Sequence, residues 1–299
     1  MKRWMRWASW GLGFIIIAVA AAALVGTTMA DRKQERRIAV GLTAIALPDD
    51  PASIARGRYL FQTRGCTECH GDDGRGRAFI NDGAFRVTGP QIAPGARSAV
   101  AAYRVEDWIR TIRHGVDPSG RALMVMPSED YNRMSDADLG ALIAYVKTMP
   151  AVDGQERVVA LPLPVRVLYG FGMIQDAAAK IDHRLPPEAA VAMATDANYG
   201  RYVANMCIGC HGAHLSGGKI PGAPPDWPAA ANLTPGEASV MPRYAKLEAF
   251  AAMLKSGKRP DGSAIAVMPF ESLRRLDDTE VAALHAFLGT LAPRSAGSR

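Results

Sequence analysis

The chain has 299 residues, enough for two ordinary domains, and 48% of them are hydrophobic against 21% charged, which excludes an intrinsically disordered protein. Its formal net charge of +6 is too small and too dispersed to indicate binding to nucleic acid. We therefore expect a globular protein with two folded units and no nucleic-acid partner.

The first segment, residues 1–30, is predicted to be an apolar helix. Residues 7–30 carry no charge and follow three basic residues, and a helix needs about 20 apolar residues to span a bilayer. The same stretch could be a cleaved signal peptide, with Thr28 and Ala30 forming the cleavage site, although its apolar run exceeds the usual ~7–15 residues. Either way we expect the rest of the chain, beginning with a juxtamembrane segment at 31–50, to be exported across the membrane, either anchored by the helix or released as a soluble protein.

The remainder of the sequence is a duplication. The motif C-x-x-C-H begins at Cys66 and again 141 residues later at Cys207. Its surroundings repeat as well: "GRYLFQTRGCTECHG" corresponds to "GRYVANMCIGCHG", "QIAPG" to "NLTPG", and "HGVDPSGRALMVMPS" to "SGKRPDGSAIAVMPF". A repeat of this length predicts two copies of one domain, at residues 51–150 and 191–295.

Each copy has the pattern of helices separated by long loops rich in glycine and proline. Helical spacing of apolar residues predicts a helix from Val105 that stops at Gly115, and a second that begins at the N-cap Ser135. The matching helices of the second copy end at Gly257 and begin at Asp277, with Glu280 in the position of a capping box. No stretch alternates convincingly like a strand, so we predict an all-α fold.

Residues 151–190 connect the copies and have no counterpart in the repeat. Their apolar centre, "LPLPVRVLYGFGMIQDAAAKI", predicts a short packed helix. We expect this connector to pack as a strap across the two domains, with contact to a membrane surface as the alternative.

C-x-x-C-H is the pattern of covalent haem attachment. Two thiols three positions apart reach the two vinyl groups of one porphyrin, and the adjacent histidine binds the iron. A redox dithiol and a zinc site are the alternatives, and the second copy in an exported chain favours haem. This interpretation assigns two haems, with thioethers at Cys66, Cys69, Cys207 and Cys210 and proximal iron ligands at His70 and His211.

The sixth iron ligand is predicted from a second repeated motif. Both copies carry "VMP", in which Met126 and Met268 follow the proximal histidines by 56 and 57 residues. A thioether ligand favours ferrous iron and raises the potential, whereas the alternative role of any methionine is core filling. Other methionines lie near enough to compete, namely Met124, Met134 and Met241.

These motifs resemble those of bacterial membrane-anchored dihaem cytochromes c. The resemblance covers approximately residues 51–293, through "CTECHG", "IRHGVDPSGRALMVMPS", "LGALIAYVKTMP", "YGRY", "CIGCHG", "ANLTPG" and "MPF". It implies two tandem class I cytochrome c-like domains with one haem c each. It also implies that the protein passes single electrons in a respiratory chain, from a dehydrogenase or other donor to a cytochrome or terminal oxidase. The resemblance places this activity on the periplasmic side of the bacterial inner membrane, with the protein anchored there by its N-terminal helix, or soluble in the periplasm if that helix is cleaved.

In the pattern of that family, a proline carbonyl about 20 residues after the proximal histidine accepts the ring N–H and orients the ligand. Pro90 matches this position for His70. Ala231 stands at the aligned place for His211, which puts the equivalent contact in doubt and would allow the two haems to differ in potential.

Other polar residues near the motifs have simpler interpretations. We expect His214 to be a solvated loop residue or a neighbour of a haem propionate and not a haem ligand. We expect Tyr59 and Tyr202, like the neighbouring Arg58 and Arg201, either to reach haem propionates or to lie exposed. The sequence has no phosphate-binding loop, zinc-protease motif or nucleophile elbow. We therefore predict an electron-transfer protein and no enzyme. The alternative is a haem enzyme, such as a dihaem peroxidase or thiosulfate-oxidising cytochrome. Such an enzyme would need an open coordination position or an unusual ligand at one iron.

Overall fold

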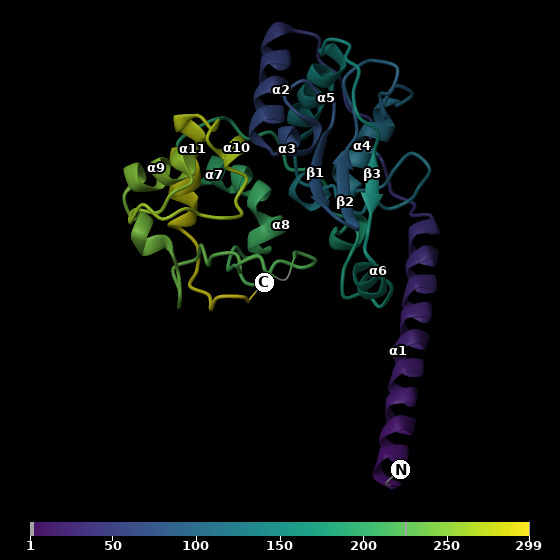
Figure 1. Cartoon of the computed structure of the whole chain (residues 1–299). Coiled ribbons are helices and arrows are strands. Elements are labelled where there is room, and N and C mark those ends of the chain that lie inside the picture. Colours follow the sequence, from purple (N-terminus) through teal and green to yellow (C-terminus); the bar gives the residue numbers. More distant parts are fainter. Residues whose placement is uncertain (1–2, 225, 299) are drawn as a thin grey trace.

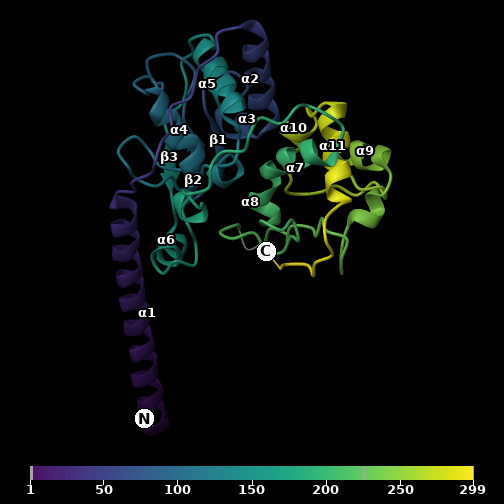
Figure 2. The ribbon, with the colours of Figure 1, turned by 180° about the vertical axis from the view of Figure 1, so that it is seen from behind.

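The structure is a computed structural model that describes residues 3–224 and 226–298. A long N-terminal helix, α1 (Arg3–Glu35), projects from a two-lobed body (Figures 1 and 2). Within the described residues α1 is the one helix long and apolar enough to cross a membrane, with a mean hydropathy of 2.3 over its most apolar window. The two lobes contain the predicted copies at residues 51–150 and 191–295, and these two ranges are called here the first and the second repeat.

The first repeat contains the helices that its sequence predicts. α4 ends at Gly115, which takes a left-handed φ of 62°, and the side chain of Ser135 accepts a hydrogen bond from the Asp138 N–H at the start of α5. Its elements in chain order are α2 (Pro51–Thr63), α3 (Cys66–His70), β1 (Arg77–Asp82), β2 (Phe85–Gly89), α4 (Val105–His114), the 3-10 helix η1 (Ser128–Asp130) and α5 (Asp136–Thr148).

The second repeat follows the same order of helices. Its elements are α7 (Ala197–Val203), η3 (Ala204–Cys207), α8 (Ile208–His211), η4 (Met241–Tyr244), α9 (Leu247–Ser256), α10 (Phe270–Leu273) and α11 (Asp278–Leu288). The predicted stop of α9 at Gly257 and N-cap of α11 at Asp277 are confirmed. The fold is therefore mostly helical, as expected.

One glycine in each repeat permits the crossing of its first and last helices. α2 packs on α5, and α7 packs on α11. A Cβ atom at Gly57 would lie 2.0 Å from the carbonyl oxygen of Ala141, and one at Gly200 would lie 1.9 Å from that of Ala283. The helix backbones touch at these points, which explains the glycine in the repeated "GRY".

The expectation of no strands is wrong for the first repeat. β1 and β2 form an antiparallel hairpin through the turn Gly83–Ala84, and β3 (Val158–Ala160) from the connector pairs with β2. Most of β1 is exposed, so it needs no apolar residue at every second position, and its sequence lacks the alternation that predicts a strand. The equally long segment of the second repeat contains Pro221, Pro224 and Pro228, which cannot donate to a strand ladder. Among its described residues, 212–224 and 226–231, the structure has an isolated bridge between Gly218 and Ala230 and no strand.

The two repeats pack together through contacts that themselves repeat. The Tyr59 hydroxyl accepts a hydrogen bond from the N–H of Asp277, the N-cap of α11, at 3.0 Å. The Tyr202 hydroxyl accepts one from the N–H of Ser135, the N-cap of α5, at 3.1 Å. Both tyrosines therefore belong to the contact between the repeats, in place of the exposed or propionate-facing position predicted for them, and the interface has approximate two-fold symmetry.

A buried ion pair lies at the centre of this interface. Both terminal nitrogens of Arg64 donate to Glu280, at 2.7 and 2.6 Å, and the Tyr199 hydroxyl donates to the same carboxylate at 2.7 Å. Burial opposes ionisation of Glu280, but these partners outweigh it and lower its pKa to about 2. The Glu280 N–H donates to the N-cap Asp277, but its carboxylate turns to Arg64, so the predicted capping box is not formed.

The segments outside the repeats also pack on them. In the connector, Glu188 accepts a hydrogen bond from Asn205 and forms ion pairs with Arg133 of the first repeat and Arg201 of the second. The connector is therefore a strap across both repeats, as expected. It also contains α6 (Leu163–Gly170) and η2 (Ala178–Lys180). After α1, the juxtamembrane segment packs three apolar side chains on the core of the first repeat: Leu42, Ile45 and Leu47.

The central ion pair predicts a large effect of Glu280→Gln on stability. The substitution leaves the Arg64 charge buried without a carboxylate, so we expect the free energy of unfolding to fall by about 3–5 kcal/mol in denaturant titrations at pH 7. The matched control is Asp72→Asn, which breaks the exposed inter-repeat pair with Arg275 (2.6 Å) and should cost less than about 1 kcal/mol.

The same ion pair has a pH dependence of known sign. Because the pKa of Glu280 is lowered from 4.5 to about 2, its contribution is complete above pH 4.5 and is lost as the pH falls towards 2. The parent protein should therefore lose more stability than Glu280→Gln across this range. Equal costs for Glu280→Gln and Asp72→Asn would contradict the importance of the buried pair.

The helix crossing predicts that Gly200→Ala is destabilising. The added methyl group must push α7 away from α11, at a cost of about 1–3 kcal/mol, measurable as a lower thermal midpoint. Gly289→Ala is the control, because it follows the same α11 with a φ of −68° and its Cβ would approach no closer than 3.4 Å to a neighbouring atom. A similar loss in both variants would show that the close approach at Gly200 is unimportant.

Candidate haem-binding sites

Each C-x-x-C-H motif forms a single helical turn. Cys66 to His70 make up α3, while in the second repeat Cys207 ends η3 and α8 runs on to His211. Residues three apart lie on the same side of such a turn. The two cysteines of each motif are thus presented together, with the histidine directly after them.

Both motif histidines are held by a main-chain carbonyl. Nδ1 of His70 lies 2.9 Å from the carbonyl oxygen of Pro90, and Nδ1 of His211 lies 2.9 Å from that of Ala231. A carbonyl only accepts, so Nδ1 carries the proton in both rings and Nε2 carries the lone pair that a metal needs. The doubt about Ala231 is therefore wrong: the acceptor is main chain, and a proline is not required.

The loop after each histidine follows the same path. The N–H of Gly76 donates to the carbonyl oxygen of His70 at 2.9 Å, and the N–H of Gly217 donates to that of His211 at the same distance. These two bonds fix each histidine backbone before the chain returns with the carbonyl that holds the ring. Burial lowers the pKa of His70, which keeps its imidazole neutral, as a metal ligand must be.

The candidate methionines lie in matching loops. Met126 precedes η1 and Met268 precedes α10, and their carbonyl oxygens accept from Ser128 and Phe270 at 2.9 and 2.8 Å. Met126 packs on the same apolar core as Cys66, and Met268 on the same core as Cys207. The structure therefore brings each motif and its methionine to one core.

Two of the competing methionines share these cores but lie on other segments of the chain. Met134 is buried within the first core, where its carbonyl accepts a hydrogen bond from Arg113, and Met241 lies in η4 against the second core. His214 is exposed on the loop after α8, as expected for a solvated residue.

Three of the four motif thiols are buried enough to resist ionisation. Burial raises the pKa of Cys66 and of Cys207 to about 12 and that of Cys69 to about 11. Reactive dithiols instead have lowered pKa values, because the thiolate is the active form. Two thiols presented on one turn beside a histidine whose Nε2 carries the lone pair are a donor set that fits covalent haem attachment.

Each motif helix also touches the other repeat. Glu68 of the first motif accepts hydrogen bonds from the N–H and hydroxyl of Ser272, at 3.2 and 3.0 Å. Asp130, which corresponds to Ser272, accepts one from the N–H of Gly209 in the second motif, at 2.7 Å. These reciprocal contacts connect each motif with the segment that follows the methionine of the other repeat. Sequence reasoning missed them, because the offsets of 141 and 142 residues show which residues are equivalent but not which ones touch.

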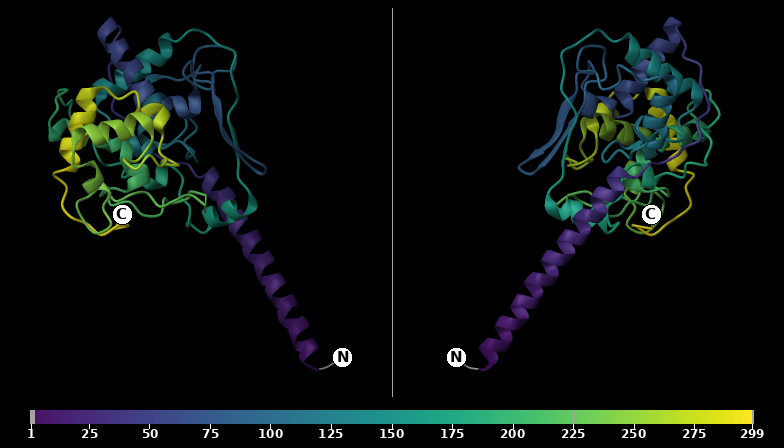
Figure 3. Two further views of the ribbon diagram at one scale, coloured as in Figure 1. Left: turned by 60° about the vertical axis from the view of Figure 1, so that its left-hand side comes forward. Right: turned by 90° about the vertical axis from the view of Figure 1, so that its right-hand side faces the viewer.

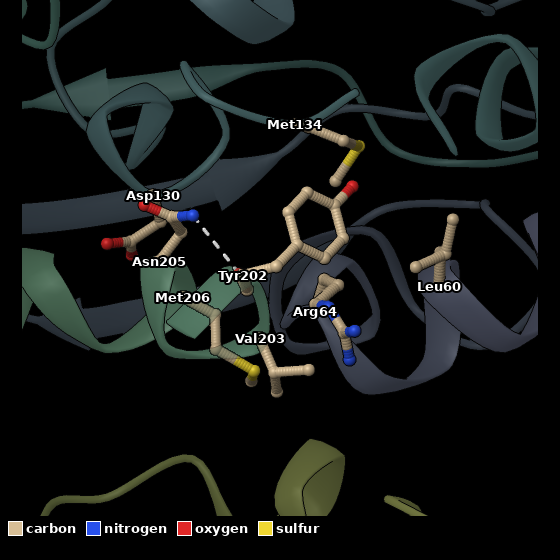
Figure 4. Close-up of a pocket in the computed structure, with 8 residues that line it drawn as sticks. All are labelled: Leu60, Arg64, Asp130, Met134, Tyr202, Val203, Asn205 and Met206. Carbon is tan, nitrogen blue, oxygen red and sulfur yellow. Dashed lines mark hydrogen bonds between the residues drawn. The ribbon is translucent and has the colours of Figure 1, made fainter. Parts of the chain in front are cut away.

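A small pocket lies along the same interface (Figure 4). It is lined by four residues of each repeat and by none of the motif cysteines or histidines: Leu60, Arg64, Asp130, Met134, Tyr202, Val203, Asn205 and Met206. A hydrogen bond from Asn205 to the carbonyl oxygen of Tyr202 crosses the view. The pocket is a gap between packed repeats, next to the two candidate sites. Within residues 3–224 and 226–298, no group of three or more His, Cys, Asp or Glu side chains is arranged to hold a metal ion.

Known proteins with similar sequences are redox subunits. A fructose dehydrogenase cytochrome subunit of Gluconobacter japonicus is 28% identical over 281 residues, which are 83% of this chain and 56% of that protein. A gluconate 2-dehydrogenase cytochrome c subunit of Pantoea cypripedii is 33% identical over 35% of this chain and 25% of its own length. The Cbb3-type cytochrome c oxidase subunit CcoP of Helicobacter pylori (strain 52) is 27% identical over 41% of this chain and 38% of its own.

The chain spans little more than half of the first of these relatives and smaller shares of the others. The sequence model of the cytochrome c family matches twice, at residues 54–150 and 199–292, and each match contains one complete C-x-x-C-H turn with its carbonyl-held histidine. The chain therefore belongs to the cytochrome c family, whose domains hold covalently bound haem c.

Proposed function

We propose that the protein is a dihaem electron relay, with one haem c in each of two domains, residues 51–150 and 191–295. A haem iron takes up and releases one electron at a time. In this proposal the thioether bonds are made by Cys66, Cys69, Cys207 and Cys210, and the irons are bound by His70 with Met126 and by His211 with Met268.

The reciprocal contact between the repeats carries this proposal. Through the bonds of Glu68 to Ser272 and of Gly209 to Asp130, each motif helix lies against the other repeat's methionine loop. The residues that would hold the two haems therefore lie in segments that meet at one shared interface. Haem c bound by them would supply the one-electron chemistry that the relay needs.

The partners are inferred from the similar proteins. Two of them are named as cytochrome subunits of dehydrogenases and one as a subunit of a cytochrome c oxidase. We infer that the donor is a dehydrogenase and the acceptor a cytochrome or terminal oxidase, and that this chain performs no substrate chemistry of its own. A haem enzyme would need an open iron, whereas the sequence supplies a methionine for each.

We also infer that α1 is retained as a membrane anchor, with the two domains on the periplasmic side. Ala30, at the end of the apolar run, is fully buried, and Lys33 donates to the carbonyl oxygen of Tyr169 in the connector at 2.8 Å. Cleavage after Ala30 would remove the apolar part of this contact. The packing of α1 on the connector therefore supports an anchor over a signal peptide.

The haem content tests the number of cofactors. The purified protein should carry the mass of two haems and twice the haem absorbance per chain of the double variant Cys66→Ala/Cys69→Ala, which should keep one. Cys207→Ala/Cys210→Ala is the matched variant in the other repeat and should also keep one. A single haem in the parent, or none, would refute the dihaem assignment.

The axial ligands are tested by Met126→Ala and Met268→Ala. Each should abolish the weak long-wavelength band of methionine-bound ferric haem for one of the two haems, and lower that haem's potential, because thioether ligation raises it. Met124→Ala is the control and should change neither. If the control loses the band and Met126→Ala does not, the ligand of the first haem is misassigned, and rapid peroxide turnover by the parent would favour the enzyme alternative.

A further inference from the structure

The connector helix α6 lies in direct contact with α1. Figure 3 shows α6 beside the end of α1 that joins the body of the protein. A Cβ atom at Gly170 would lie 1.9 Å from the carbonyl oxygen of Gly26, and one at Gly26 would lie 2.9 Å from a methyl carbon of Val167. The two helix backbones therefore touch, with no side chain between them.

Polar contacts fix this arrangement beyond the crossing point. Arg166 of α6 pairs with Asp31 at 2.7 Å, and Arg36 donates to both oxygens of the buried Asp176 at 2.8 and 3.0 Å. The Tyr169 hydroxyl also donates to Asp176, at 2.8 Å. Asp31 and Arg36, which make these contacts, both follow the apolar run of α1. The charged side of the contact therefore faces the body of the protein.

Three large apolar side chains of the same segment are largely exposed, although the ring of Phe171 also reaches Gly26 of α1. Leu163 is 55% exposed, Phe171 47% and Met173 70%, and they lie at the two ends of α6. In a soluble protein such side chains beside a packed helix are an unfavourable exposure unless a partner or a lipid surface covers them.

The position at which α6 crosses α1 indicates what covers these three side chains. Gly26 lies four residues before Ala30, the end of the uncharged run, and at a rise of about 1.5 Å per residue this is about 6 Å inside that end. Amphipathic helices at membrane surfaces bury their apolar faces about 5–10 Å into the boundary between headgroups and acyl chains. A helix that touches α1 at Gly26 is therefore at the depth of this boundary whenever α1 spans a bilayer.

We propose that residues 163–173 form a second membrane contact, in which Leu163, Phe171 and Met173 enter the periplasmic leaflet beside α1. This inference rests on the proposed retention of α1 as an anchor. The ligand is the lipid surface itself. Because β3 and η2 tie the connector to the first repeat on either side of α6, the contact would hold that repeat in one orientation on the membrane.

The test uses the full-length, haem-loaded protein in nanodiscs of phosphatidylcholine and phosphatidylglycerol, with no other protein present. One lipid component carries a diazirine near the headgroup end of an acyl chain, and the adducts formed on illumination are located by peptide mass spectrometry. We expect adducts on α1 and on residues 163–173. Leu185 in the connector and Met193 just after it, which are 48% and 51% exposed, serve as internal controls and should be labelled several-fold less.

A pair of matched variants completes the test. Phe171→Asp/Met173→Asp should reduce labelling of residues 163–173 to the level of the controls, whereas Leu185→Asp/Met193→Asp should leave it unchanged, with the haem spectrum of both variants intact. If α1 is labelled and residues 163–173 are not, this inference is refuted while the anchor stands, and a protein partner becomes the cover to seek. If α1 is not labelled either, the proposed anchor fails and this inference with it.

Discussion

The buried pair of Arg64 and Glu280 is the interaction on which the arrangement of the two repeats depends. Arg64 stands two residues before the first haem-binding motif, and Glu280 lies in the first turn of the last helix of the other repeat. Two charges removed from water are tolerable only while they face each other with their hydrogen bonds made. The pair therefore penalises any other docking of the repeats and fixes the register of the weaker contacts around it.

The interface also explains how a duplicated domain becomes a relay. In one copy, the motif helix and methionine loop would present polar groups, such as Glu68 and Asp130, to solvent. The second copy supplies the matching donors, Ser272 and Gly209, at equivalent positions, so each repeat completes the surface of the other. Symmetry of this kind makes both directions of contact arise from one set of residues.

Symmetry ends where the connector begins. The hairpin of the first repeat accepts β3 as a third strand, whereas the prolines of the second repeat prevent a ladder at the matching place. The connector consequently belongs mainly to the first repeat, and through α6 it binds that repeat to α1. The two halves thus have unequal surroundings although their motif histidines are held in the same way, and the first half is the one connected to α1.

Periodic and local features could be read from the sequence without the structure. Helix ends at Gly115, Ser135, Gly257 and Asp277 depend on hydrogen bonds within a few residues, and the two C-x-x-C-H motifs are contiguous, so short-range chemistry defines them. The repeat itself then assigned equivalent roles to both halves. The exposed strand β1 gave no such signal, because alternation appears only where one face is buried.

Only the tertiary structure decided which residues that are distant in the chain come into contact. Glu280 has the sequence position of a capping residue, yet a guanidinium 216 residues away captures its carboxylate. Ala231 stands where the family pattern has a proline, yet its carbonyl oxygen reaches His211 because the backbone follows the same path. The sequence alone thus determined the cofactor-binding turns and the helical class, since these follow from local spacing. The pairing of the repeats and the packing of α6 on α1 required the tertiary structure, because burial, charge and close backbone approach act through space.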